Sequence, residues 1–281
     1  MRPSIILQYV LPHRLLSRVV YWATRWSWRP WKNLLITQIA SRYKVDLGEA
    51  ANPDIESYVH FNAFFTRRLK PAARPLDADP AALLCPADGR ISQAGSIRAG
   101  RIFQAKGQQY SVGELLGDDA QAQRYADGSF VTVYLSPRDY HRVHMPLAGE
   151  LVSTLHVPGR LFSVAPDPVE SIPRLFARNE RLVCHFEGEH GAFVVVMVGA
   201  MLVSSVSTVW RDLEIPPYAA RATLRDYRGK GIRLDRGAEM GRFNMGSTVI
   251  VLLPAHGARL DAQLSPERAV RMGERIGSTP G

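Results

Sequence analysis

The hydrophobic pattern of this 281-residue chain changes from helical to β spacing at about residue 83, and this change constrains the fold more than any other feature. Before it, aromatic and aliphatic residues recur at helical intervals, notably over residues 54–69. After it, short apolar runs alternate with Gly and Pro, which is typical of strands and turns. The expected strands cover residues 130–135, 150–155, 182–186, 193–206 and 247–253. We therefore expect a β barrel or sandwich behind a helical N-terminus, with poor order after Leu264.

The first 45 residues contain no Asp or Glu, yet they carry the basic residues Arg2, Arg14, Arg18, Arg25, Arg29, Lys32, Arg42 and Lys44. They also hold Trp22, Trp26, Trp28 and Trp31. On a helix over residues 12–29, ended by Pro30, four arginines share one arc and Leu, Val and Trp occupy the opposite half. This pattern is typical of a helix lying in the interface of an anionic membrane. Packing of the helix on the protein's own core is the alternative, and nucleic acid is disfavoured because no nucleic-acid module is visible.

Other composition features exclude several classes of protein. No apolar stretch reaches the roughly 18 residues of a membrane span, and residues 5–11 lack a signal-peptide cleavage site. An acid-free, Arg-rich start also resembles a transit peptide, but the aromatic content fits an interface better. The two cysteines, Cys85 and Cys184, form no disulfide framework and are compatible with a reducing compartment.

Three separated segments carry side chains suited to catalysis. They contain Asp88 before Gly89, the pair His141 and His144, and Ser247 at the start of the last apolar run. Each segment also has a purely structural interpretation. Asp88 could cap a turn, His141 and His144 could be buried structural residues, and Ser247 could lie in an ordinary turn. Together they suit a Ser-His-Asp hydrolase or a chain that cuts itself at a glycine carbonyl, although the Gly-x-Ser-x-Gly pattern of many hydrolases is missing. No metal is expected, because no Cys or carboxylate lies near the His-x-x-His pair in sequence.

In combination these segments resemble the phosphatidylserine decarboxylases, a pyruvoyl-dependent family. Residues 62–71, 106–112, 115–117 and 156–164 extend the resemblance, which covers roughly residues 50–255. Met245 is a departure, since Leu is commoner there, but the two side chains have similar volumes. The resemblance implies an α+β fold with a largely antiparallel β core preceded by amphipathic helices. It also implies a membrane-associating segment, 1–50, and a catalytic domain, 51–281.

The resemblance further implies that the chain cleaves itself between Gly246 and Ser247, into residues 1–246 and 247–281. Asp88 and His144 would activate Ser247, which would become a pyruvoyl group that condenses with the amine of phosphatidylserine. His141 is the candidate proton donor as phosphatidylethanolamine and carbon dioxide form, with no metal and no pyridoxal phosphate. The implied headgroup loop contains Pro158, Gly159, Leu161 and Phe162.

The expected assembly is a non-covalent pair of the large and small chains, with two such pairs in a dimer. We expect it on the cytoplasmic face of the cell membrane, as a peripheral protein bound to anionic phospholipid. Two other functions remain open from sequence: a Ser-His-Asp lipid ester hydrolase and a non-catalytic membrane-binding β module.

Overall fold

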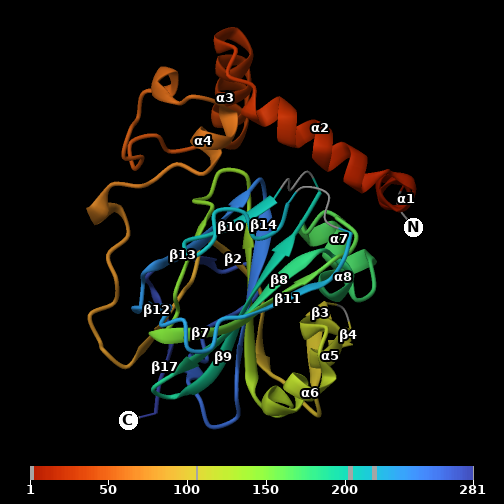
Figure 1. The fold of residues 1–281 in the computed structure, drawn as a ribbon, viewed down its shortest axis with the longest axis vertical. Coiled ribbons are helices and arrows are strands. Elements are labelled where there is room, and N and C mark those ends of the chain that lie inside the picture. The colour runs from red at the N-terminus through yellow and green to blue at the C-terminus, as the bar shows by residue number, and fades with distance from the viewer. Residues whose placement is uncertain (1–2, 106, 202–204, 217–219, 281) are drawn as a thin grey trace.

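In the computed structural model, the helices of residues 3–65 lie across one end of an antiparallel β core, and the later helices lie beside it (Figure 1). The structure describes residues 3–105, 107–201, 205–216 and 220–280, so Lys106 and residues 202–204 of the predicted segments lie outside it. The helices are α1 (Pro3–Val10), α2 (His13–Arg25), α3 (Arg29–Tyr43), α4 (Phe61–Phe65), α5 (Val112–Leu116), α6 (Asp119–Ala122), α7 (Pro166–Ser171) and α8 (Leu175–Arg178).

The strands form one large sheet and three small ones. The large sheet has the order β11-β7-β8-β9-β14-β5-β2-β16, with β12 beside β7; β10-β13-β6, β1-β17-β15 and β3-β4 are separate. The strands are β1 (Ala82–Leu84), β2 (Gly89–Ser96), β3 (Arg101–Ala105), β4 (Gln108–Ser111), β5 (Ser129–Leu135), β6 (Arg142–His144), β7 (Gly149–Val157), β8 (Arg181–Gly188), β9 (Gly191–Gly199), β10 (Ser205–Thr208), β11 (Thr223–Asp226), β12 (Arg233–Leu234), β13 (Glu239–Asn244), β14 (Ser247–Leu253), β15 (Arg259–Leu260), β16 (Ala269–Val270) and β17 (Arg275–Ser278).

Strand β14 lies inside the large sheet, where it pairs antiparallel with β5 on one side and β9 on the other. Its apolar run is continuous because both faces are buried. Val249, Val251 and Leu253 point into one core cluster, while Ile250 and Leu252 point into the other. The strand therefore ties the two halves of the core together.

The two clusters explain the layered architecture. Beneath one face of the large sheet, side chains of β1, β6, β10, β13 and β17 complete the first cluster. Over the other face, β3, β4, α5, α7 and α8 complete the second cluster. All described pairings within the sheets are antiparallel, and the outer strands β11 and β16 do not pair with each other. The α+β prediction with an antiparallel, sandwich-like core is confirmed.

Several predicted boundaries differ from the structure. Helix α2 ends at Arg25 because Trp26 is extended, and Pro30 instead lies in the first turn of α3, where its missing N–H costs nothing. The helical region expected over 54–69 contains only a short turn and α4, because the backbone at His60 is extended. Poor order after Leu264 is wrong: β16 pairs with β2, and β17 pairs with β1. The division of the chain at residue 50 stays a prediction.

Helix α2 packs on the core with its polar side. His13, Ser17 and Thr24 are buried, whereas Leu15 is 58% exposed and Trp22 is 66% exposed. A soluble amphipathic helix normally buries its apolar face, so this orientation opposes the alternative of core packing through Leu, Val and Trp. In the part of the chain that the structure describes, every helix is too short or too polar to cross a bilayer.

The position of β14 generates a stability prediction. Replacing Ile250, which is fully buried, with Ala should lower the free energy of unfolding by about 2–5 kcal/mol, because a cavity forms in the second cluster. The matched control is Leu224→Ala on β11, where the side chain is 68% exposed and the expected change is below about 0.5 kcal/mol. Urea unfolding followed by tryptophan fluorescence measures both, and equal shifts would contradict the central role of β14.

Candidate active site

Ser247 begins β14 at the junction of two sheets. The chain runs from β13, in the sheet of β6 and β10, through Met245 and Gly246 directly into β14. Ser247 lies opposite Leu135 of β5 and Gly199 of β9. It is 1% exposed, and its Oγ has no hydrogen-bond partner among the described residues. A buried hydroxyl without a partner is costly, and the neighbouring Thr248 Oγ1 is in the same state, so the position of Ser247 before a strained turn is what distinguishes it.

The two residues before Ser247 combine strain with open space. Met245 has φ 92°, a left-handed conformation that costs a residue with a side chain about 1–3 kcal/mol. Its side chain packs against a small cluster built around Ile36, Phe61, Phe64 and Phe65 of α3 and α4. A Cβ added to Gly246 would meet no atom within 4 Å. The helical end of the molecule therefore holds a strained turn, and space remains beside the Gly246 carbonyl group.

His144 lies on β6 with both ring nitrogens engaged. Nδ1 donates to the Gly237 carbonyl oxygen at 2.8 Å, so the proton is on this nitrogen. Nε2 accepts from the Tyr140 hydroxyl at 3.1 Å. Burial lowers the pKa of His144, although the Gly237 contact acts in the opposite direction. The imidazole is therefore neutral at pH 7, with a basic lone pair on Nε2, which is the form that a general base requires.

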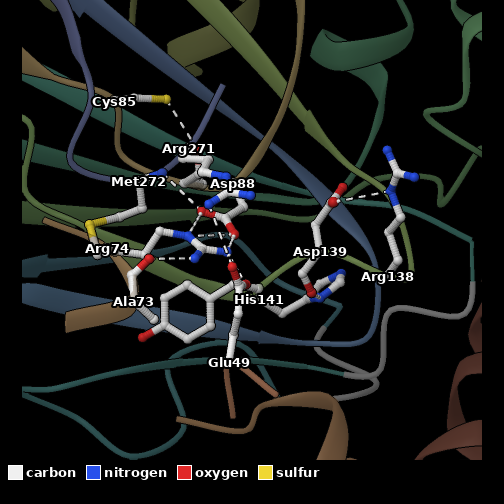
Figure 2. Close-up of polar contacts among 12 residues, drawn as sticks. Glu49, Ala73, Arg74, Cys85, Asp88, Arg138, Asp139, His141, Arg271 and Met272 are labelled. Atoms are coloured by element: carbon white, nitrogen blue, oxygen red, sulfur yellow. Dashed lines mark hydrogen bonds and ion pairs between the residues drawn. The ribbon is translucent and has the colours of Figure 1, made fainter. Parts of the chain in front are cut away.

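Asp88 is bound to Arg74 and to the C-terminal part of the chain (Figure 2). Arg74 Nε lies 2.9 and 3.0 Å from the two Asp88 oxygens, and Arg74 Nη2 also donates to Glu49 at 2.7 Å. The Met272 N–H donates to Asp88 Oδ1 at 2.9 Å. This ion cluster fixes the Asp88 carboxylate and joins segments before and after Ser247.

The structure brings the Asp88 and His144 segments together through the backbone, since the His144 N–H donates to the Pro86 carbonyl oxygen at 2.8 Å. Among the described contacts, however, no hydrogen bond joins Asp88 to His144 or His144 to Ser247. The triad roles of these three residues stay predictions. Sequence reasoning missed Arg74, which carries no motif, and it left Tyr140 without a role although Tyr140 directly precedes His141.

His141 is fully buried beside Phe65, with their ring centroids 3.9 Å apart. Its Nδ1 donates to the Asp139 carbonyl oxygen at 2.8 Å, whereas Nε2 has no partner in the part of the chain that the structure describes. Burial lowers the pKa of His141 to about 3. Nε2 therefore carries no proton in this state, and His141 could donate a proton from there only after gaining one.

The predicted headgroup loop is covered by α1 and α2. Phe162 is fully buried against the rings of Tyr9 and His13, and the Leu161 N–H donates to His13 Nδ1 at 3.1 Å. Asn179 also donates to the Phe162 carbonyl oxygen at 2.9 Å. Leu161 and Phe162 thus already have protein partners, whereas Pro158 is only half-buried and a Cβ on Gly159 would lie 2.5 Å from a backbone oxygen. The role of the loop stays a prediction.

Cysteine and metal chemistry find no support in the described residues. Burial raises the pKa of Cys85 to about 12, and its thiol donates to the Ala87 carbonyl oxygen at 3.1 Å. Cys184 is likewise buried. No group of three His, Cys, Asp or Glu side chains in the described ranges is arranged to hold a metal ion.

Two cavities bear on ligand binding. One, of about 460 Å³, lies between the helical end and β13 and is lined by Arg67 and Asn244 among others. A larger one, of about 570 Å³, lies among β7, β8 and the segment before β12, and includes His185 and Arg228. None of the predicted site residues lines the larger cavity, so it is separate from the site around Ser247.

Comparison with known proteins gives the family. The model described as phosphatidylserine decarboxylase matches residues 61–278, and a second model, described as PSD, matches residues 3–44. The chain is 62% identical over 271 residues to the phosphatidylserine decarboxylase proenzyme of Xanthomonas euvesicatoria pv. vesicatoria, covering 96% of each chain. It is 60% identical to that of Xanthomonas axonopodis pv. citri and 59% identical to that of Stenotrophomonas maltophilia, each with the same coverage. The chain therefore belongs to the phosphatidylserine decarboxylase family.

Proposed function

We propose that this chain is a self-processing decarboxylase that converts phosphatidylserine to phosphatidylethanolamine and carbon dioxide through a pyruvoyl group made from Ser247. One observation carries the proposal: in a chain of this family, a buried Ser247 hydroxyl without a partner follows the strained Met245 and the unhindered Gly246. This arrangement suits an attack on the peptide bond that precedes the serine.

The self-cleavage begins when Ser247 Oγ adds to the Gly246 carbonyl carbon while His144 Nε2 takes the hydroxyl proton. The C–N bond then breaks, the nitrogen regains a proton, and an ester joins the two residues. Loss of the Ser247 Cα proton expels the Gly246 carboxylate. Hydrolysis of the unsaturated terminus then releases ammonia and leaves the pyruvoyl group. Since Tyr140 engages Nε2 in the uncut chain, this contact must change before the attack.

The residues around Ser247 fit such a group. The apolar remainder of β14 stays hydrogen-bonded to β5 and β9, so the new terminus keeps its place after the cut. When formed, the pyruvoyl group supplies a carbonyl that withdraws electrons from the substrate as carbon dioxide leaves. Ser247 is 1% exposed between β5 and β9, which excludes bulk water, and His141 Nε2, which has no partner among the described residues, can gain and return a proton.

The first test removes the nucleophile. Ser247→Ala should leave a single uncut chain, because no hydroxyl remains to attack Gly246, and intact mass spectrometry measures this directly. The matched control is Thr248→Val, which removes the neighbouring buried hydroxyl and should still yield two fragments with the cut before residue 247. A cut at Gly246 in the Ser247→Ala chain would exclude the mechanism.

The second test concerns Asp88. Burial lowers the pKa of His144, and the charge of Asp88 is the smallest of the effects that oppose it, so Asp88→Asn should weaken the base modestly. We expect self-cleavage to slow by roughly 3- to 10-fold, followed as the loss of full-length chain on denaturing gels. Asp226→Asn, at a side chain that is 59% exposed on β11, should cut at the normal rate. Normal cutting by Asp88→Asn would remove Asp88 from the machinery.

We further propose that α1 and α2 hold the protein on the cytoplasmic face of an anionic membrane as a peripheral protein. Trp22, Trp26, Leu15 and Val19 project outward from one face of α2, each more than half exposed. Arg14 and Arg18 are exposed beside them. Such a pairing of apolar and basic groups favours binding to an anionic interface. The family resemblance also implies a dimer of processed pairs, which light scattering of the purified protein would test.

Membrane binding can be tested with the arginines that face outward. Arg14 and Arg18 are both exposed on α2 whereas Arg25 is half-buried, so the test uses Arg14→Gln together with Arg18→Gln. Each lost charge removes about 1 kcal/mol near an anionic surface, so partitioning onto phosphatidylglycerol vesicles should fall roughly 30-fold. The double variant Arg98→Gln and Arg101→Gln, on the β core, is the control. Binding is measured by co-sedimentation with vesicles. Equal binding by the two double variants would place the membrane contact elsewhere.

A further inference from the structure

A basic cavity lies between the N-terminal helices and the β core, beside the residues that precede Ser247. Its volume is about 460 Å³, within the range of small-ligand sites. Tyr21 and Arg25 of α2 line one side, and Asn244 of β13 lines another. Asn244 accepts a hydrogen bond from Asn62 Nδ2 at 2.9 Å, which ties α4 to the strand that leads into the cleavage site. The cavity is therefore a direct neighbour of the candidate active site.

Positive charge dominates the described lining of this cavity. Asp212 is its acidic residue, whereas the basic side chains are Arg25, Arg67, Arg68, Arg142 and Arg242. Arg142 is neutralised by Glu239 at 2.7 Å, and Arg242 lies 3.3 Å from the exposed Asp212. Burial is the largest cause that lowers the pKa of Arg25. The positive charge of Arg242 lowers this pKa further, as expected for like charges in proximity. An anion in the cavity would relieve this repulsion.

Arg67 indicates that a ligand of this cavity would carry negative charge. It follows α4, is 5% exposed, and lies with Cζ 5.4 Å from the Phe64 ring centroid. Its Nη2 donates to the Arg138 carbonyl oxygen at 3.1 Å, but Nε and Nη1 have no partner among the described residues. Leaving a buried N–H donor unpaired is costly, and here two such donors belong to a residue that lines the cavity. An oxyanion would satisfy them with strong, charge-assisted hydrogen bonds.

We propose that this cavity binds the phosphodiester of the phosphatidylserine headgroup and that Arg67 is its principal ligand, an inference that rests on the proposed function. The location fits a lipid whose chains remain in the membrane. Helix α2 exposes Leu15 and Trp22 on its outer face and presents Tyr21 and Arg25 to the cavity. A headgroup held there would lie between the proposed membrane surface and the turn at Met245.

The headgroup has two anionic groups, and the chemistry favours the phosphate for Arg67. The carboxylate loses its charge as carbon dioxide leaves, so a cation bound to it would stabilise the ground state and slow the reaction. The phosphodiester keeps its charge throughout, so its binding by Arg67 assists substrate and transition state equally. Loss of Arg67 should therefore raise KM and leave kcat unchanged.

Binding is tested first, without turnover, on the full protein by phosphorus NMR titration. The main probe is glycerophosphocholine, which has the phosphodiester but neither a carboxylate nor a primary amine. Arg67→Met should weaken its binding about 10- to 100-fold, whereas Arg101→Met on β3 should bind like the wild type. Equal binding by Arg67→Met and the wild type, or no binding by the wild type, overturns the proposal. Binding of inorganic phosphate alone would identify a free-phosphate site and would also overturn it.

Kinetics then separate this inference from the proposed function. Arg67→Met and Arg67→Lys are first checked for self-cleavage by intact mass, then assayed on soluble short-chain phosphatidylserine. We expect a KM raised about 10- to 100-fold for Arg67→Met, partly restored in Arg67→Lys, with kcat unchanged. A reduced kcat with normal KM would place Arg67 in the chemistry and overturn the phosphate role. Absence of cutting and of carbon dioxide release in the wild type would instead reject the proposed function, while the NMR result would stand on its own.

Discussion

The pairing of β14 with a strand on each side is the constraint on which the site depends. Hydrogen bonds to β5 and β9 fix the backbone, and burial of alternate side chains in two clusters fixes the register. Ser247 is the first residue of this strand, so it cannot move to relieve the turn before it. The strain therefore concentrates at Met245, which the helical cluster holds from the other side.

Burial also sets the charge states of the two histidines of the candidate site. His141 and His144 are both held neutral by their surroundings, and each donates its Nδ1 proton to a backbone carbonyl. The negative charge of Asp88 is matched by Arg74, which in turn contacts Glu49. Burial thus keeps basic lone pairs available on both imidazoles at neutral pH, although the charge of Asp88 still acts on His144.

Sequence reasoning succeeded where one local pattern decides the structure. The bounds of β14 matched the prediction because a run buried on both faces has no other place than the interior of a sheet. It failed for the helix over 12–29, where two backbone angles near Trp26 rather than side-chain pattern end the helix. The segment after Leu264 looked weak because its strands are very short, and they are stabilised by partners in β1 and β2 far away in sequence.

At the candidate site, too, sequence reasoning could not identify partners that are far apart in the chain. Asp88, His144 and Ser247 could be selected from their motifs, but the ion partner of Asp88 could not, because Arg74 reaches it only through the path of the folded chain. Arg67 lies in residues 54–69, where the spacing of aromatic residues predicts a helix but gives Arg67 no role. Only the three-dimensional structure shows that Arg67 lines a cavity and has two donors without a partner among the described residues.

The interior position of β14 limits whether the protein can refold once it has been cut. If the chain is cut before Ser247, the small chain supplies a middle strand, and residues 269–278 pair with strands of the large chain. Separate fragments would have to open a finished sheet to reach that place, so folding must be complete before the cut. After the cut, the nucleophile and the covalent connection are both gone. Unfolding of the mature protein would then be a one-way event, and cells would replace lost enzyme by new synthesis rather than by refolding.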